Sequence, residues 1–493
     1  MSGPATTSRS LCLPERRWLT GLFLLFLLVR CGALWHFWPG LHSDPDAYLG
    51  IARQIAAGHG MTAPESDRPT AFRPPLYPLL LAPIAQESQI LARAWLHLAL
   101  AGFTWLAMVR LGCNLGLSVF QIGIASLIFT FDPLSLRYIA LPMTETLCTC
   151  LATLLLMLLT LPPFQIQSAL NQKKSLQPPD ADASGRRSLC RRQDRRNILT
   201  GIVFGLTVLS RPTFWLFGII AGVWWFIQQQ FIRSPFTSLP ERTSVLRTSC
   251  MVLMGTACLV VPWMIRNQLV MGSPILMTTH GGYTLLLGNN PAFYQEVVSQ
   301  PGGTIWDGSH GEGQEGWWKT IQQQIDKKQI HGEVAVDRWM TQLAKRSITS
   351  HPSLFLKACL LKFCWFWNIA PHGPEAAHLP RTILWEIRIF YSLFWLSAGL
   401  GLLRLWRQSL RKSTAAHPSN RQNFTETQTF SGSLTREDLQ RWHTLVLLIL
   451  SLSAPHLLYW SDARMRAPLV PALALLAASI WTWTPWRPLP RKK

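Results

Sequence analysis

The chain has 493 residues, 48% of them hydrophobic and only 14% charged, with a formal net charge of +21. Its apolar residues gather in runs of about twenty, the length that crosses a bilayer, which excludes a soluble globular protein and predicts an all-α polytopic membrane protein. The lysines and arginines crowd into some loops and are balanced by acids in others. The positive charge therefore indicates membrane topology and argues against a nucleic-acid partner.

The apolar runs predict about ten transmembrane helices, within a range of about eight to thirteen. In chain order they cover residues 18–38, 90–110, 115–131, 142–161, 197–210, 212–230, 249–265, 383–405, 443–460 and 467–484. The first run is longer than the core of a signal peptide, and no small-residue cleavage pattern follows it. We therefore expect it to be an uncleaved span.

Basic residues set the predicted topology. Loop 162–196 carries eight lysines and arginines against three acids, and residues 491–493 are all basic. By the positive-inside rule these segments lie in the cytoplasm, so loops 39–89 and 266–382, whose charges are mixed, face the opposite side. The sequence thus predicts a multi-pass protein of the inner cell membrane, with its candidate site on the extracytoplasmic face.

This map divides the chain into modules. Residues 1–265 form an N-terminal transmembrane module that includes the first outer loop, residues 266–382 form a small extracytoplasmic cap, and residues 383–493 form the C-terminal transmembrane helices. Segments 165–196 and 408–438 are rich in polar residues such as Ser, Gln, Thr and Asn. Because they cannot bury enough apolar surface to order themselves, we expect both to be disordered cytoplasmic linkers.

Two further segments are predicted to lie in the membrane interface rather than to span it. Leu354–Trp367 is apolar but is interrupted by Lys357 and Lys362, and segment 75–86 contains three prolines. In the cap, glycine-rich turn signals precede an amphipathic stretch over residues 316–350. We therefore expect the cap to be mostly helical.

The first outer loop holds the candidate catalytic acids. Asp44 and Asp46 closely follow the first span, at a depth where a carboxylate can stay hydrated. The alternative for either one is an N-cap of the helix predicted from Ala47, because aspartate is a favoured capping residue. Farther along this loop, Arg73 and Tyr77 lie where a proline-rich segment stiffens the backbone.

Other polar residues recur near the outer ends of predicted spans and would converge if the helices bundle. They are Arg137, Glu145, Arg211, Arg266, His280, Asn289, Asp462, Arg464 and Arg466. Arginine forks bind phosphate and a carboxylate can take the proton from a hydroxyl, so the set suits a lipid-linked phosphate donor. For any single arginine the alternative is a snorkelling contact with lipid headgroups.

A family resemblance rests on stretches spread over nearly the whole chain, namely SDPDAYLGIARQIAAGHG, RPPLYPLLLAP, MTETLCTCLATLLL, GIVFGLTVLSRPT, VPWMIRNQLVMGSPILMTTHGGYTLLLGNNP and DARMRAPLVPALALLA. With these stretches in this order, the chain resembles the integral-membrane C-type glycosyltransferases that use polyprenyl-phosphate sugars. That family includes protein O-mannosyltransferases and the lipid A aminoarabinose transferase. An acid in its first outer loop is implicated as catalytic, and alignment on the following Tyr-x-x-x-Ala-Arg puts it at Asp44. The family often has Asp-Glu where this chain has Asp44-Pro45-Asp46, so the choice between the two aspartates stays open.

The resemblance implies an inverting transfer of one sugar from a polyprenyl phosphate to an acceptor hydroxyl on a protein, glycan or lipid. Asp44 or Asp46 would be the base, and arginines would stabilise the departing phosphate. No metal ligand is assigned, and a role for a divalent metal stays open.

A transporter or flippase of a lipid-linked sugar would use the same charges for binding alone, although we find no internal repeat of the kind many transporters have. A non-catalytic membrane scaffold is a third reading, against which the clustering of charge on one face argues.

Overall fold

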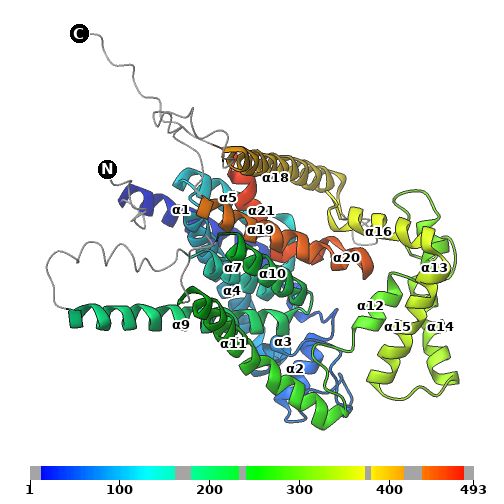
Figure 1. Cartoon of the computed structure of the whole chain (residues 1–493). Helices are drawn as coiled ribbons and strands as arrows, with labels where there is room; N and C mark the ends of the chain where they lie inside the picture. The colour runs from blue at the N-terminus through cyan, green and yellow to red at the C-terminus, as the bar shows by residue number, and fades with distance from the viewer. Residues whose placement is uncertain (1–12, 162–178, 233–239, 372–378, 416–435, 482–493) are drawn as a thin grey trace.

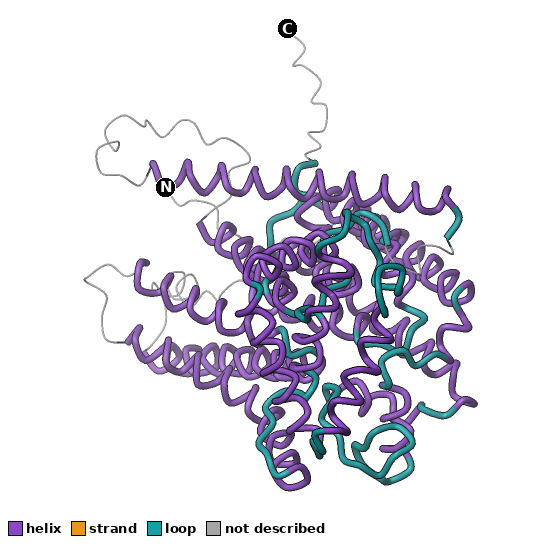
Figure 2. The backbone as a smooth tube through the Cα atoms, turned by 90° about the vertical axis from the view of Figure 1, so that its right-hand side faces the viewer, coloured by secondary structure: helices purple, strands orange, loops and turns teal. Residues whose placement is uncertain are grey.

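The computed structural model describes residues 13–161, 179–232, 240–371, 379–415 and 436–481. Within these ranges the chain is all-helical and has no strand; a single antiparallel bridge joins Thr62 to Pro69. Figure 2 shows helices and loops only. The predicted all-α fold class is therefore confirmed for the described part of the chain.

The helices before residue 280 are α1 (Leu13–His36), η1 (Trp38–His42), α2 (Tyr48–Ala56), α3 (Leu76–Leu81), η2 (Ala82–Ile84), η3 (Glu87–Gln89), α4 (Ile90–Asn114), α5 (Val119–Phe131), α6 (Pro133–Tyr138), α7 (Glu145–Thr160), α9 (Pro179–Ser210), α10 (Phe214–Ile232) and α11 (Pro240–Met271). Those after it are α12 (Gly281–Leu287), α13 (Pro291–Phe293), the π-helical η4 (Tyr294–Val298), α14 (Gly313–Lys327), α15 (Glu333–Ser350), α16 (Pro352–Phe366), α18 (Arg381–Ala415), α19 (Arg436–Ser453), α20 (Pro455–Leu458), η6 (Ala463–Leu469) and α21 (Val470–Ala478).

Every segment that was predicted to span the membrane contains a helix. Fewer of these helices than predicted are both long enough and apolar enough to cross a bilayer. Among the described residues four stretches are long and apolar enough to cross a membrane: Pro14–His36, Glu87–Asn114, Leu246–Met271 and Arg381–Leu410. Three other apolar helices are shorter, at Val119–Phe131, Glu145–Thr160 and Phe214–Gln228. The first of them ends where Asp132 and Pro133 begin α6. About ten transmembrane helices thus stays a prediction.

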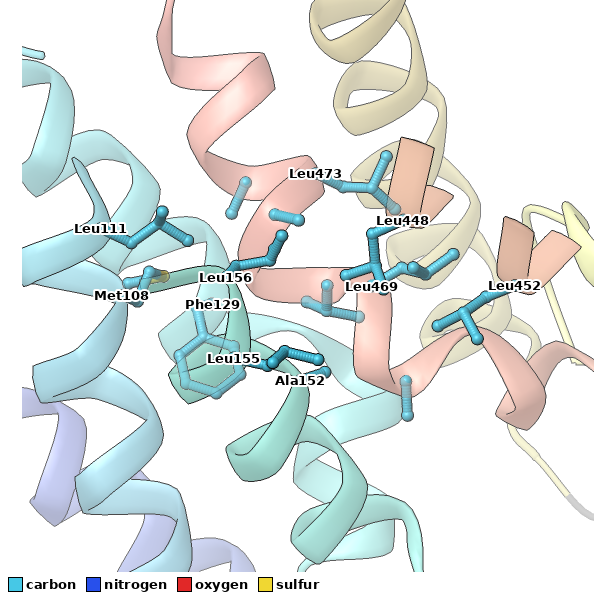
Figure 3. Packing of buried hydrophobic residues seen from close by; sticks show 14 of the residues in the cluster. Met108, Leu111, Phe129, Ala152, Leu155, Leu156, Leu448, Leu452, Leu469 and Leu473 are labelled. Atoms are coloured by element: carbon cyan, nitrogen blue, oxygen red, sulfur yellow. The ribbon is translucent and has the colours of Figure 1, made fainter. Parts of the chain in front are cut away.

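The bundle is built around α21, which is buried along its whole length. It contacts α4, α5, α7 and α18, and its alanines let those helices approach closely. Figure 3 shows Leu473 of α21 and side chains from other helices near it, including Met108, Phe129 and Leu155. Lipid tails are as apolar as leucine, so inside a bilayer this packing stabilises the fold through dense van der Waals contact. The buried α21 in turn fixes η6, the segment that immediately precedes it.

Glycines bring α9 and α11 into close contact. A Cβ built on Gly201 would overlap the carbonyl oxygen of Val252, and one on Gly255 would overlap that of Ile198. These backbones therefore approach more closely than any side chain at either position allows. The crossing holds the C-terminal half of α9 in place, and with it Arg211 one residue beyond the helix.

Replacing Gly201 by valine should therefore push α9 and α11 apart. Overpacking of this kind costs about 1–3 kcal/mol, which thermal unfolding of the purified protein in detergent would measure. The matched control is Gly222→Val on α10, where a Cβ meets nothing within 4 Å. If the two variants unfolded at the same temperature, the close crossing of α9 and α11 would be contradicted.

The cap is helical and has its own buried cluster, which includes Phe293, Tyr294 and Met340. Figure 1 shows α12 to α15 at one end of the bundle, away from the first turns of α1 and α9 at the other end. The prediction of one helical stretch over 316–350 is wrong about its continuity. The stretch is divided into α14 and α15, because Gln329 and Gly332 have φ of 50° and 87°, outside the helical region.

Helices also extend into both predicted linkers. α9 already begins at Pro179, α18 continues to Ala415, and α19 begins at Arg436, so the outer parts of segments 165–196 and 408–438 are helical. Once a long apolar helix is nucleated, each further residue adds one backbone hydrogen bond, and arginine is a good helix former. The remaining parts of these linkers, 165–178 and 416–435, lie outside the described residues.

Candidate active site

Asp46 lies between two arginines that come from distant parts of the chain. Its Oδ1 accepts a hydrogen bond from Nη2 of Arg73 at 3.1 Å, and its Oδ2 accepts one from Nη1 of Arg464 at 2.8 Å. Nε of Arg73 also donates to the backbone oxygen of Asp46 at 2.8 Å. The carboxylate is 15% exposed, so both ion pairs are largely shielded from water.

Glu145 makes the second half of the same charge network. It begins α7, where the partial positive charge of a helix N-terminus favours a carboxylate. Its Oε1 lies 3.1 Å from Nη2 of Arg211 and 3.7 Å from Nη1 of Arg464. Its side chain is 2% exposed, and no hydrogen bond to its Oε2 is found among the described residues.

We call Asp46, Arg73, Glu145, Arg211 and Arg464 the arginine–carboxylate cluster. Its members come from the first outer loop, the start of α7, the end of α9 and η6, so the fold brings together segments that are far apart in sequence. Three arginines face two carboxylates, which leaves one positive charge in excess. A cluster with this balance is suited to an anionic ligand.

Local contacts hold the arginines of the cluster in position. Oδ1 of Asp462 caps η6 by accepting from the backbone N–H of Arg464 at 3.4 Å. In the first outer loop, the backbone oxygens of Thr70 and Met61 accept hydrogen bonds from Arg266 of α11, at 2.9 and 2.6 Å. Asp462 and Arg266 thus lie outside the cluster and position the segments that carry Arg464 and Arg73.

Asp44 has a different environment from Asp46. Its Oδ1 accepts from the backbone N–H of Leu49 at 2.9 Å and its Oδ2 from that of Gly50 at 2.7 Å. These two N–H groups belong to the first turn of α2, where backbone donors have no acceptor within the helix. Asp44 therefore caps the start of α2, which is the structural role that we considered as the alternative to catalysis. Asp46 is the aspartate that belongs to the cluster.

His280 extends the network on the cap side. Its Nε2 lies 3.4 Å from Nη1 of Arg73. A guanidinium only donates, so Nε2 must accept and the proton of the neutral ring is on Nδ1, for which the described residues offer no partner. Burial and the charge of Arg73 lower the pKa of His280 to about 3, so the ring is neutral at physiological pH.

The arginines also keep the central carboxylate ionised. Burial alone would raise the pKa of Asp46, but the charges of Arg464 and Arg73 outweigh it and hold the pKa below the usual range of an aspartate. For Arg464, burial lowers the pKa, and the neighbouring Glu145 and Asp46 carboxylates raise it by more. Both partners of this ion pair are therefore charged at neutral pH.

Two residues predicted to bind substrate have structural contacts instead. Tyr77 is fully buried, and its hydroxyl lies 2.7 Å from Nε2 of His97. The guanidinium of Arg137 lies 5.1 Å from the centre of the Phe37 ring, a cation–π contact at the end of α1. Neither makes a hydrogen bond or an ion pair to the cluster among the described residues.

Asn289 and Arg466 are likewise held away from the cluster. Asn289 is buried and donates to the backbone oxygens of Leu285 and Leu458, tying the cap to α20. Arg466 is also buried and donates to the backbone oxygens of Phe366 and Asn368, at 2.8 and 2.7 Å. Both side chains donate to backbone carbonyl groups and so connect separate parts of the fold.

A cavity of about 290 Å³ opens beside Arg73, between the first outer loop and the cap. It is lined by Phe72, Arg73, Thr279, His280, Tyr283, Trp318, Glu333, Val336, Asp337 and Met340. The sequence-based prediction included Arg73 and His280 but missed the aromatic and acidic residues. Two of the missed residues, Glu333 and Asp337, are four residues apart in the stretch predicted to be helical. This spacing places both carboxylates on one face of a helix, which could have indicated a shared role.

Metal binding has no preformed site in the described ranges. No group of three or more His, Cys, Asp or Glu side chains there is arranged to hold an ion.

No protein-family model matches the chain, and no curated protein matches it in sequence. Among solved structures, the chain is similar to the Archaeoglobus fulgidus oligosaccharyltransferase tethered to an acceptor peptide, with 11% identity and a TM-score of 0.45 over 94% of this chain and 49% of that one. It is also similar to the archaeal oligosaccharyltransferase AglB of Archaeoglobus fulgidus in complex with an inhibitory peptide and a dolichol-phosphate, with 11% identity and a TM-score of 0.46 over 95% and 50%. The chain thus spans about half the length of these structures. Because similarity at this level does not transfer an activity, the function has to be inferred from the site itself.

Proposed function

We propose that the chain is an inverting glycosyltransferase that moves a sugar from a polyprenyl-phosphate donor to an acceptor hydroxyl on the extracytoplasmic face of the inner membrane. The observation that carries this proposal is the arginine–carboxylate cluster, in which an ionised aspartate and an excess of arginine meet where apolar helices end. A lipid-linked phosphate must be bound at such a place, because its chain stays in the bilayer and its charge stays outside it.

In this mechanism Arg464 and Arg211 bind the donor phosphate. Both guanidinium groups already engage the Oε1 of Glu145, which therefore acts as a positioning residue for the pair. Arginine presents a planar fork of donors and stays charged at any working pH, so it can stabilise the negative charge that develops on the departing phosphate. Polyprenyl phosphate is a good leaving group and needs little protonation.

Asp46 is the proposed base. It takes the proton from the acceptor hydroxyl while that oxygen attacks the anomeric carbon, and the carbon–oxygen bond to phosphate breaks with its electron pair on the phosphate. A single displacement needs one base and inverts the anomeric centre. Support for Asp46 over Asp44 comes from their partners, since Asp44 accepts two backbone hydrogen bonds from α2 and Asp46 contacts the arginines.

Donor binding would also prepare the base. Before donor arrives, Arg464 and Arg73 hold the pKa of Asp46 low, which makes it a weak proton acceptor. A bound phosphate competes for Arg464, weakens its ion pair with Asp46 and so raises the basicity of the carboxylate. The acceptor is therefore activated mainly when donor is present.

The proposal is tested by incubating purified protein with labelled polyprenyl-phosphate sugars and a membrane extract that supplies acceptors. Transfer of label out of the lipid donor, with release of polyprenyl phosphate in equal amount, is the expected result. Intact donor after prolonged incubation with every sugar tried would contradict an enzyme and favour binding or transport.

The topology that places the cluster outside gives a separate prediction. Reporter fusions within 162–196 and 406–442 should read cytoplasmic, and fusions within 290–340 should read extracytoplasmic, because basic residues dominate the first two loops. An external signal from 406–442 would mean that α16 spans the membrane and that the predicted map is wrong. The fusions in 290–340 act as the internal reference for the external signal.

A further inference from the structure

The cavity beside Arg73 differs in chemistry from the arginine–carboxylate cluster. Aromatic and acidic side chains dominate its wall, with Arg73 as the basic residue that it shares with the cluster. We propose that it is the acceptor pocket and that it binds a sugar ring, so that the enzyme extends a glycan or glycolipid rather than modifying a protein side chain. This inference rests on the proposed function and names the acceptor class for it.

Aromatic rings form one part of the wall. Tyr283 and Trp318 are set edge to face, with ring centres 5.1 Å apart and planes at 85°, and Phe72 lies next to Tyr283 with 6.2 Å between ring centres. A sugar ring has faces covered by C–H groups and a rim of hydroxyls. Rigid aromatic faces bind such C–H surfaces with little loss of side-chain entropy.

Carboxylates form another part. Glu333 and Asp337 are one helical turn apart on α15, so they lie on the same side of the helix. Oε1 of Glu333 accepts from the backbone N–H of Ala71 at 3.2 Å and from the hydroxyl of Thr279, and Oδ1 of Asp337 accepts from the N–H of Gly282 at 2.6 Å. Within the described ranges the second oxygen of each carboxylate accepts no hydrogen bond, so two fixed acceptors are left for ligand hydroxyls.

The size of the cavity favours a compact ligand. Its volume of about 290 Å³ lies at the low end for small-ligand pockets. A single sugar ring fits this space. An extended peptide is usually bound along a sheet edge or in a long groove, and the described residues form no strand.

The position of the cavity also matches the chemistry. Arg73 lines it and pairs with Oδ1 of Asp46, and Arg464 pairs with Oδ2 of the same carboxylate. In an inverting displacement the attacking hydroxyl and the leaving phosphate are on opposite faces of the reacting carbon. An acceptor in the cavity and a phosphate at Arg464 and Arg211 would therefore lie on opposite faces of the anomeric carbon, with Asp46 within reach of the acceptor hydroxyl.

Saturation-transfer NMR on the full chain in lipid nanodiscs tests the pocket with two sets of probes, neutral methyl hexosides and short peptides that contain serine or threonine. We expect the hexosides to bind and the peptides not to bind. Trp318→Leu should weaken hexoside binding about two- to tenfold, as expected for loss of one aromatic contact. Asp337→Asn should weaken it in the same direction and provides a second variant in case Trp318→Leu does not fold.

Matched controls are Trp385→Leu at the start of α18 and Asp326→Asn on α14, both exposed and away from the cavity. Hexoside binding equal in Trp318→Leu and Trp385→Leu, or binding of the peptides instead of the hexosides, would overturn the proposal. Asp46→Asn should still bind hexosides. A wild-type enzyme that transfers sugar but binds no hexoside would refute the pocket alone, whereas hexoside binding without any transfer would refute the proposed function.

Discussion

Replacing Asp46 by asparagine should lower sugar transfer by about 10²–10⁴-fold, the usual contribution of a general base. Asparagine has nearly the same size but cannot accept the proton of the acceptor hydroxyl. It also cannot form the two ion pairs with Arg73 and Arg464, so Arg464 no longer has to exchange Asp46 for the donor phosphate. Donor binding should therefore be kept or become tighter while transfer is lost.

The neighbouring aspartate is the matched control for this experiment. Asp44→Asn keeps one oxygen for the first turn of α2 and loses one of its two backbone hydrogen bonds, which costs about 1 kcal/mol of local stability. Transfer by purified, folded protein should stay near the wild-type rate. Loss of transfer confined to Asp44→Asn would return the catalytic role to the residue that the family alignment favours.

The second large effect is expected at Arg464. Lysine keeps the positive charge but loses the fork that contacts Asp46, Glu145 and the proposed phosphate. Arg464→Lys should reduce kcat/KM for the donor by about 10- to 100-fold, as expected for one charge-assisted hydrogen bond to a phosphate. The kinetics would be measured over a range of donor concentration at a fixed, saturating acceptor.

Arg388→Lys on α18 is the control for that substitution, because Arg388 stacks on Trp385, away from the cluster. It should leave kcat/KM unchanged. Equal activity of Arg464→Lys and wild type would assign Arg464 to a headgroup contact, the alternative that the sequence left open for each arginine.

Much of the site was predictable because topology restricts where polar groups can lie. Asp46, Glu145, Arg211 and Arg464 all follow or precede apolar runs at the ends assigned to the outer face, and helices that bundle bring such ends together. The apolar runs predicted helices because backbone N–H and C=O groups inside a bilayer must bond to each other, and a helix satisfies them within one segment.

Choices between close neighbours could not be predicted. Asp44 and Asp46 follow the same span, and the backbone decides between them: Ala47 has φ of 62°, and the turn ahead of it directs the Asp44 carboxylate onto α2. Arg464 and Arg466 are two residues apart in η6. Arg464 joins the cluster, whereas Arg466 donates to backbone carbonyl groups outside it. Such differences depend on dihedral angles and on distant partners that no local pattern encodes.

The cavity was missed for a related reason. Phe72 belongs to the first outer loop, whereas Trp318 and Glu333 belong to separate helices of the cap, which had no predicted packing partner. The contacts that join them, such as the backbone N–H of Ala71 to Glu333, connect residues far apart in sequence. Spacing alone gave no reason to place these segments together.

The central claim is most directly tested by following the polyprenyl phosphate itself in sealed proteoliposomes that contain the purified protein, labelled donor and acceptor. We expect wild-type protein to convert donor to free polyprenyl phosphate and glycosylated acceptor in equal amounts. This conversion should require acceptor on the side of the cap, and Asp46→Asn should lower it by about 10²–10⁴-fold. Movement of intact donor between the two leaflets, without any release of polyprenyl phosphate, would contradict the account and identify a transporter.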